Sequence, residues 1–145
     1  MKRSIVAAAG AIVALSAFVS VNAARDAADR EAVEKPLKMY LSGEPEQLKQ
    51  AFHPGATMFF ARNDSLIAVP IPDYIARVAE SRAKGPPPQR TERIAHVDIS
   101  GTSAVAQLEL EYQNQKITDY MSLVKYAGQW RIVNKIFSRE MVAPK

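Results

Sequence analysis

The fold is decided by the stretch from Lys116 to Lys135, KITDYMSLVKYAGQWRIVNK. Apolar and polar residues alternate on both sides of Ala127-Gly128, a pattern typical of two antiparallel strands joined by a two-residue turn. Residues that face each other across such a hairpin share a side of the sheet. The predicted pairs are Lys125 with Trp130, Leu123 with Ile132, Met121 with Asn134, and Asp119 with Ile136.

This register makes Asp119 and Asn134 diagonal neighbours on an otherwise apolar face. A polar pair in such a place indicates either a hydrogen-bonded core or a ligand pocket. Asp119 is the candidate catalytic residue, because a carboxylate in apolar surroundings suits a general base. The alternative is that Asp119 bonds Asn134 or a helix amide and only fixes the packing.

Three further residues are candidates for ligand binding. Asn134 offers both a donor and an acceptor, so it could orient a ligand carbonyl or hold Asp119. Tyr40 lies on the apolar stripe of a predicted helix, where its hydroxyl either reaches a cavity or marks the surface end of a core residue. Trp130 either lines the same cavity or fills the core.

The histidines give no metal or catalytic site. His53 precedes a proline at a helix end, which favours a capping or packing role. His96 and Asp98 share one side of a strand, but the predicted register places them on the outer face. Two separated histidines and no cysteine exclude a metal site, and no cofactor motif is present.

The first 23 of the 145 residues are predicted to be a signal peptide. Lys2 and Arg3 supply the positive start, an apolar run extends from Ile5 to Val21, and Val21-Asn22-Ala23 forms the cleavage site. The alternative is an uncleaved anchor. Cleavage leaves residues 24–145 as one exported domain, periplasmic or secreted, with no stable membrane anchor and no disulfide.

The charge of the chain argues against a nucleic-acid partner. The formal net charge is +4, and Lys2 and Arg3 contribute two of these charges. The remaining excess is small and is interspersed with acidic residues, whereas nucleic-acid binding needs a concentrated basic surface.

The rest of the chain predicts helices before and between short strands, and then a four-stranded meander. A helix over 26–41 carries Val33, Leu37, Tyr40 and Leu41 on one face, contains Pro36, and ends at Gly43. A short helix is predicted from Glu44 to Phe52, followed by strands over 56–62 and 65–69 around an Asn63-Asp64 turn. A third helix begins at Pro72, with Arg77, Glu80 and Arg82 pointing outward, and a connector over 84–90 follows it. The strands of the meander are joined by turns at Gly101-Thr102, Gln113–Gln115 and Ala127-Gly128.

Carrying the pairing across the three turns separates two faces of the meander. The predicted inner face, against the helices, is Arg93, Ala95, Val97, Ile99, Ala104, Ala106, Leu108, Leu110, Ile117, Asp119, Met121, Leu123, Trp130, Ile132, Asn134 and Ile136. The outer face carries Tyr120, Val124, Tyr126, Val133 and Phe137 together, which predicts a homodimer through this surface.

The element order resembles that of the cone-shaped NTF2-like superfamily. Three segments carry a closer resemblance to its lumazine-binding, SnoaL-like subgroup: Ala51-Phe52-His53-Pro54, Thr118 to Leu123 (TDYMSL) and Gly128 to Lys135 (GQWRIVNK). The resemblance implies a pteridine-like ligand, although the scaffold hosts isomerases, dehydratases, hydrolases and binding domains.

We therefore expect an α+β fold of the NTF2-like cone type, with three N-terminal helices packed on a curved antiparallel sheet. The expected function is binding of a small, partly apolar molecule in a conical cavity. Two alternatives stay open: an acid–base enzyme of the isomerase or dehydratase type that uses Asp119, and a dimerising interaction module.

Overall fold

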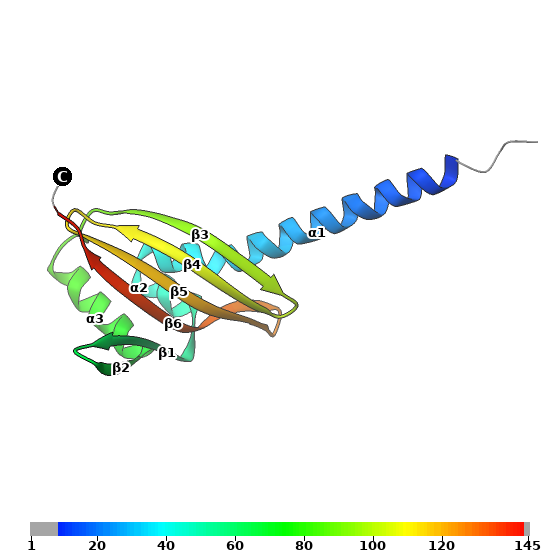
Figure 1. The fold of residues 1–145 in the computed structure, drawn as a ribbon. Coiled ribbons are helices and arrows are strands. Elements are labelled where there is room, and N and C mark those ends of the chain that lie inside the picture. Colours follow the sequence, from blue (N-terminus) through cyan, green and yellow to red (C-terminus); the bar gives the residue numbers. More distant parts are fainter. Residues whose placement is uncertain (1–8, 144–145) are drawn as a thin grey trace, which may run out of the picture. The chain divides into compact units, whose positions relative to one another are not determined.

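The computed structural model describes residues 9–143. Its elements are α1 (Ala9–Ser42), α2 (Pro45–Ala51), β1 (Phe52–Arg62), β2 (Ser65–Pro70), α3 (Ile71–Lys84), β3 (Thr91–Ser100), β4 (Ser103–Glu111), β5 (Gln115–Tyr126) and β6 (Gln129–Met141) (Figure 1). The chain forms two compact units, Met1–Glu31 and Ala32–Lys145, and the architecture below is that of the second.

Helix α1 begins at Ala9, earlier in the chain than the predicted start at residue 26. Of the predicted signal peptide, residues 1–8 lie outside the described residues. No helix in the described part of the chain combines the length and the apolar character that crossing a membrane requires.

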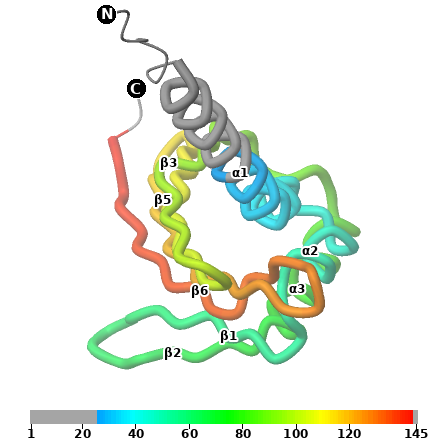
Figure 2. The backbone as a smooth tube through the Cα atoms, turned by 90° about the vertical axis from the view of Figure 1, so that its right-hand side faces the viewer, coloured from blue at the N-terminus to red at the C-terminus, as the bar shows by residue number. Residues whose placement is uncertain are grey.

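The sheet has six strands in the order β2-β1-β6-β5-β4-β3. Strands β3 to β6 form the predicted antiparallel meander. The prediction of a wholly antiparallel sheet is wrong, because β1 runs parallel to β6. The three helices are also not consecutive, since α3 follows the β1–β2 hairpin. Figure 2 shows the curved strands opposite α2 and α3.

The C-terminal part of α1 packs as its periodicity predicts. Val33, Leu37, Tyr40 and Leu41 are all buried, because residues three and four apart fall on one face of a helix. The helix continues through Pro36. It ends at Ser42, and the next residue, Gly43, has a φ of +64°, in the left-handed region that glycine adopts without strain.

Two arginines bind the carbonyl groups that α1 leaves free at its C-terminus. Arg82 donates to the carbonyl oxygens of Ser42 and Gly43 at 3.1–3.3 Å. Arg90 donates to the carbonyl oxygen of Leu41 at 2.6 Å. The outward orientation predicted for Arg82 is therefore wrong: its guanidinium satisfies helix-end carbonyls that would otherwise lack donors.

A β-bulge in β6 changes the predicted register after Ile132. The pairs Lys125 with Trp130 and Leu123 with Ile132 are confirmed, but Ser122 then pairs with Asn134. Val133 is therefore the extra residue of the bulge. Beyond it Met121 faces Lys135, and Asp119 faces Phe137. The predicted pairs Met121 with Asn134 and Asp119 with Ile136 are wrong.

A second bulge in β3 changes which residues of that strand face the helices. Ile94 pairs with Leu108, whereas His96 pairs with Gln107, so Ala95 is the extra residue. Before this bulge Ile94 lies on the inner side and Arg93 on the outer side, opposite Glu109. The inward placement of Arg93 is wrong, and its guanidinium instead bonds the Glu109 carboxylate at 2.8 Å.

One hydrophobic core joins the concave side of the sheet to the helices. Phe52, Leu108, Leu123 and Ile132 have at most 1% of their surface exposed. The predicted inner residues Val97, Ala104, Ala106, Leu110, Met121 and Trp130 are also buried. Asp119 and Lys135 are the charged residues buried among them.

Candidate functional site

Asp119 is buried at the centre of the core and contacts two polar side chains from different elements. The Tyr40 hydroxyl donates to Oδ2 of Asp119 at 2.6 Å. Nζ of Lys135 forms an ion pair with Oδ1 at 2.9 Å. Asp119 has no exposed surface, and Tyr40 and Lys135 are each 5% exposed. The three side chains, called the Asp119 cluster below, join α1, β5 and β6.

Aromatic rings surround the ammonium group of Lys135. Nζ lies 4.8 Å from the ring centroid of Phe137, 5.1 Å from that of Tyr40 and 5.9 Å from that of Tyr74. These contacts favour the charged amine. Burial acts in the opposite direction and lowers the pKa of Lys135, although the Asp119 carboxylate partly offsets this effect.

The two tyrosines of this region stay protonated over a wide pH range. Burial and the negative charge of Asp119 raise the pKa of Tyr40 well above its usual value. The same two causes raise the pKa of Tyr74 to about 12. Tyr40 is therefore a donor to Asp119 near neutral pH.

The Asp119 cluster holds charge inside the fold and offers no open path to a substrate. Tyr40 and Lys135 occupy the two carboxylate oxygens of Asp119. A general base must come within about 2.6–3.2 Å of the proton that it removes, and Asp119 has no exposed surface. The geometry supports a structural role for this carboxylate.

The Asn134 side chain does not bond the Asp119 carboxylate. The bulge at Val133 turns Asn134 away from the cluster, and its Nδ2 donates to the backbone oxygen of Thr57 at 3.2 Å. Asn134 thus links β6 to β1. Sequence reasoning missed Lys135, although a buried carboxylate signals that a cation must be near.

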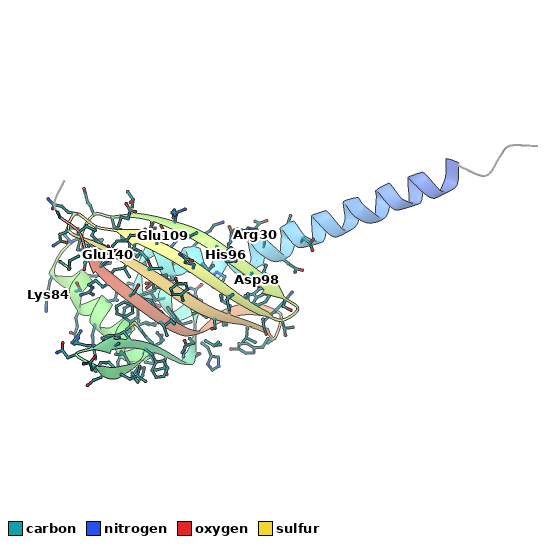
Figure 3. All side chains as sticks on the ribbon, in the orientation of Figure 1. Arg30, Lys84, His96, Asp98, Glu109 and Glu140 are labelled. Carbon is teal, nitrogen blue, oxygen red and sulfur yellow. The ribbon has the colours of Figure 1, made fainter. Side chains whose placement is uncertain are left out.

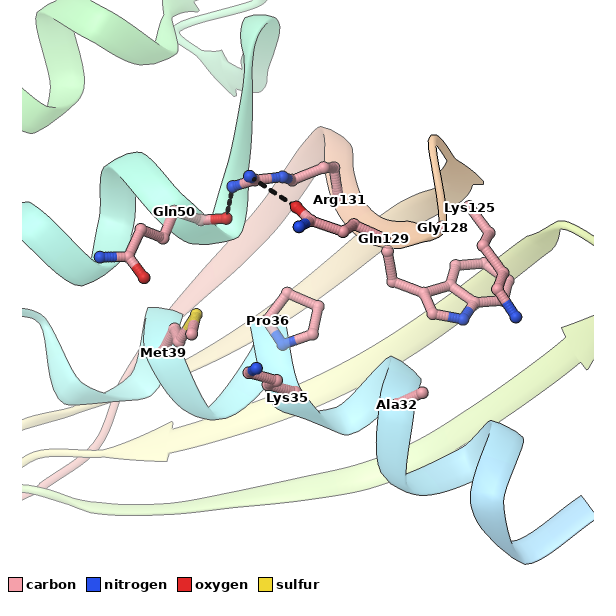
Figure 4. A pocket seen from close by; sticks show the side chains of 10 residues that line it. Ala32, Lys35, Pro36, Met39, Gln50, Lys125, Gly128, Gln129 and Arg131 are labelled. Atoms are coloured by element: carbon pink, nitrogen blue, oxygen red, sulfur yellow. Dashed lines mark hydrogen bonds between the residues drawn. The ribbon is translucent and has the colours of Figure 1, made fainter.

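A pocket of about 420 Å³ opens between α1 and the β5–β6 hairpin (Figure 4). We call it the Trp130 pocket. Its lining residues are Ala32, Lys35, Pro36, Met39, Gln50, Lys125, Gly128, Gln129, Trp130 and Arg131. Trp130 is 6% exposed, and its Nε1 has no hydrogen-bond acceptor in the described part of the chain. The structure thus joins Trp130 to a pocket, separately from Asp119 and Tyr40.

Arg131 fixes one wall of the Trp130 pocket. Its guanidinium donates to the backbone oxygen of Gln50 and, at 3.0 Å, to Oε1 of Gln129 (Figure 4). These bonds connect β6 to the end of α2. The opposite wall is the face of α1 that carries Lys35 and Met39. The pocket is therefore bounded by regular elements and does not depend on a long loop.

The remaining polar candidates lie elsewhere. His96 and Asp98 are both exposed on β3, away from the helices (Figure 3). His53 lies in β1 and accepts a hydrogen bond from the Gly55 amide at 3.0 Å, a local contact within the strand. Within the described residues no group of three or more His, Cys, Asp or Glu side chains could hold a metal ion.

A family model matches residues 25–138 of the chain, and this family is described as "Putative lumazine-binding". The chain belongs to this family. The match covers the last turns of α1 and nearly all of the sheet, so it includes both the Asp119 cluster and the Trp130 pocket. A search of curated proteins found no match.

Solved structures confirm the NTF2-like fold. An NTF2-like protein of unknown function from Shewanella baltica OS155 superposes with a TM-score of 0.69 at 27% identity, over 79% of this chain and 95% of that one. An NTF2-like protein of unknown function from Methylobacillus flagellatus KT superposes with a TM-score of 0.63 at 33% identity, over 79% of this chain and 93% of that one. An NTF2-like protein of unknown function from Silicibacter pomeroyi DSS-3 superposes with a TM-score of 0.68 at 18% identity, over 79% of this chain and 98% of that one.

Proposed function

We propose that this chain is a small-molecule-binding domain whose ligand occupies the Trp130 pocket. The observations that carry the proposal are the pocket of about 420 Å³ that Trp130 lines and the indole Nε1 of this residue, which is covered and has no acceptor among the described residues. A buried donor without a partner costs about 1–3 kcal/mol. A ligand oxygen bound beside Trp130 would recover that free energy.

The size and lining of the pocket fit a small, partly apolar molecule. Its volume of about 420 Å³ falls within the roughly 300–1,000 Å³ typical of ligand sites. Pro36, Met39 and the indole ring supply apolar surface, while Gln50 and Gln129 supply amide groups. Such a mixture of apolar walls and a few polar groups is typical of binding sites.

The site proposed here differs from the conical cavity that the sequence predicts around Asp119. Tyr40 and Lys135 enclose that carboxylate, so an enzyme that uses Asp119 as a base gains no support from the geometry. The apolar groove of about 410 Å³ between α2 and α3, lined by Phe52, Ile71 and Ile75 among others, offers no buried donor without a partner.

A substitution that fills the Trp130 pocket with a large side chain tests the proposed binding site. Ala32 lines the pocket from α1, and Ala32→Trp places a large ring inside it. Ala83→Trp makes the same change at an exposed position of α3. Both variants and the wild type are melted with a panel of pteridines, flavins, steroids and small lactones.

A ligand of the Trp130 pocket raises the melting temperature of the wild type and of Ala83→Trp, but not that of Ala32→Trp, because only a protein that binds gains stability from it. Equal stabilisation of all three proteins would move the site elsewhere on the molecule.

We also propose that the domain acts outside the cytoplasm, in the periplasm or as a secreted protein. The support is the positive start, apolar run and Val21-Asn22-Ala23 site of the sequence. The family match begins at residue 25, just after this site. Intact mass of the exported protein should correspond to a chain that starts at Ala24. Full-length protein in the membrane fraction would support an uncleaved anchor.

A further inference from the structure

The apolar groove between α2 and α3 is separate from the Trp130 pocket. We call it the His53 groove, and its lining residues come from 45–49 in α2, 52–54 at the start of β1 and 71–79 in α3. None of these residues lines the Trp130 pocket. Its volume of about 410 Å³ is also within the roughly 300–1,000 Å³ typical of ligand sites.

The lining of the His53 groove is mostly apolar and carries balanced charge. Phe52, Ile71 and Ile75 are buried, with at most 8% of their surface exposed, and prolines and alanines supply most of the remaining lining. The two charged lining residues, Glu46 and Lys49, bond each other at 2.6 Å. Because their charges cancel, the groove suits a neutral molecule that is apolar over most of its surface.

His53 supplies a hydrogen-bond donor to this groove. Its Nδ1 accepts a hydrogen bond from the Gly55 amide at 3.0 Å. In a neutral imidazole one nitrogen accepts and the other donates, so this bond places the proton on Nε2. No acceptor for Nε2 exists among the described residues. A ligand oxygen in the groove can therefore take this hydrogen bond.

Two contacts hold the imidazole ring of His53 in one orientation. The ring of Tyr126 meets it edge-on, with the ring centroids 5.6 Å apart. Gly55 lets the ring lie against the backbone, because a Cβ at this residue would be only 3.2 Å from Nδ1. A donor that is already ordered loses little conformational freedom when a ligand binds.

We infer that the His53 groove is a second binding site, which takes a small neutral molecule with an apolar body and a carbonyl oxygen. The carbonyl accepts a hydrogen bond from Nε2 of His53, and the apolar body lies against Phe52, Ile71 and Ile75. A carbonyl suits this place better than a hydroxyl, because a hydroxyl would bring a second donor into apolar surroundings.

Three pairs of compounds test this site: 1-indanone and indane, 1-tetralone and tetralin, and 4-phenyl-2-butanone and butylbenzene. In each pair a methylene group replaces the carbonyl. The compounds are titrated into the wild type and into His53→Phe, which keeps an aromatic ring and removes the donor. The shift of the Gly55 amide in ¹H–¹⁵N correlation spectra gives the affinity.

For at least one pair, we expect His53→Phe to weaken ketone binding about threefold or more, because one net hydrogen bond is lost. The affinity for the matching hydrocarbon should stay within about twofold of the wild type. Equal weakening of ketone and hydrocarbon, or no saturable binding of any of the three ketones, would overturn the inference.

Filling variants show where the ketone binds. Ala76→Trp places a large ring in the groove from an exposed position of α3 and should abolish ketone binding. Ala83→Trp, on the same helix and outside the groove, should bind the ketone as the wild type does. Equal binding by these two variants would place the ketone elsewhere and overturn the inference.

Two further measurements exclude other sites and occupants. Ala32→Trp fills the Trp130 pocket and should keep the ketone affinity of the wild type. Loss of ketone binding in Ala32→Trp would assign the ketones to the Trp130 pocket and overturn the second site. Ala76→Trp should also sediment as the wild type does, since a change in its oligomeric state would show that the groove holds a second copy of the chain.

Discussion

At the scale of single residues, Asp119 and Lys135 depend on each other. Each is almost fully buried, and an isolated charge in such a place costs several kcal/mol, of order 5 or more. The ion pair at 2.9 Å, the Tyr40 hydroxyl and the aromatic rings around Lys135 offset this cost. Removal of one partner therefore affects the stability of the fold before it affects any ligand.

We predict that Lys135→Met lowers the free energy of unfolding by about 3–5 kcal/mol, because it leaves Asp119 buried without a cation. Lys49→Met is the matched control: it breaks an ion pair with Glu46 in which both side chains are more than half exposed, so its cost is about 0–1 kcal/mol. Urea denaturation measures both. Equal losses in the two variants would refute the role of the buried pair.

The raised pKa of Tyr74 predicts that the fold loses stability at alkaline pH. Its pKa is raised to about 12 in the folded protein, so the unfolded chain releases the proton first as the pH rises. The stabilisation that the protonated Tyr74 provides is complete below about pH 10 and is lost between pH 10 and 12. The free energy of unfolding falls by at most about 2.7 kcal/mol over this range. The wild type should therefore lose stability relative to Tyr74→Phe over that range.

Urea midpoints measured from pH 8 to 12 check the sign of this effect. Tyr120→Phe removes the hydroxyl of a residue that is 47% exposed and serves as the control. Its stability should run parallel to that of the wild type. If the Tyr74→Phe and wild-type curves stay parallel as well, burial does not hold the Tyr74 proton.

The sequence predicts part of this site and not the rest. Asp119 and Tyr40 are placed on facing apolar stripes by simple periodicity, and the structure brings them together. Lys135 could not be placed, because IVNKIF reads equally well with Asn134 or Lys135 turned inward. The acceptor-free Nε1 of Trp130 depends on the surrounding packing, which alternation does not encode.

At the scale of secondary-structure elements, the bulge at Val133 decides which face of β6 meets the helices. Strand alternation has a period of two, so one extra residue exchanges the faces of everything beyond it. The C-terminal end of α1 before Gly43 and the turns at Asn63-Asp64, Gly101-Thr102 and Ala127-Gly128 follow from their residue types, and the structure confirms them. The two bulges have no comparable local signal.

Deletion of Val133 should give a regular register that keeps the pairs on both sides of the bulge. Ser122 would still face Asn134, and Met121 would still face Lys135, so Asp119 keeps its cation and we expect a loss smaller than the roughly 3–5 kcal/mol of Lys135→Met. Insertion of one glycine in the exposed Asn63-Asp64 turn is the control, since a longer surface loop costs only about 0.6 kcal/mol per doubling of its length. Circular dichroism during urea denaturation compares them. A deletion variant that loses as much stability as Lys135→Met would contradict this register.

At the scale of the whole molecule, the outer face of the sheet carries exposed apolar side chains. Tyr120 and Ile136 are cross-strand partners and are 47% and 48% exposed, and Val105 on β4 is 52% exposed. Part of the outer face predicted from the sequence is corrected by the bulge: Phe137 packs against the core, and Ile136 takes its place outside. This surface still suits a second copy of the chain.

We predict a homodimer through this face. Tyr120→Glu should give a soluble monomer, because an unpaired charge buried at an interface is costly. Thr102→Glu, in an exposed turn, should leave the dimer intact. Sedimentation velocity at micromolar concentration distinguishes the two states. A wild-type protein that is already monomeric under these conditions would contradict the predicted homodimer.

The central claim of this account is that a ligand binds at the indole N–H of Trp130. The chain contains one tryptophan, so a ¹H–¹⁵N correlation spectrum holds a single indole resonance that reports on the pocket directly. Titration with a panel compound that stabilises the wild type but not Ala32→Trp should shift this resonance saturably. An indole resonance that stays unchanged while the ligand binds would place the site elsewhere and contradict the account.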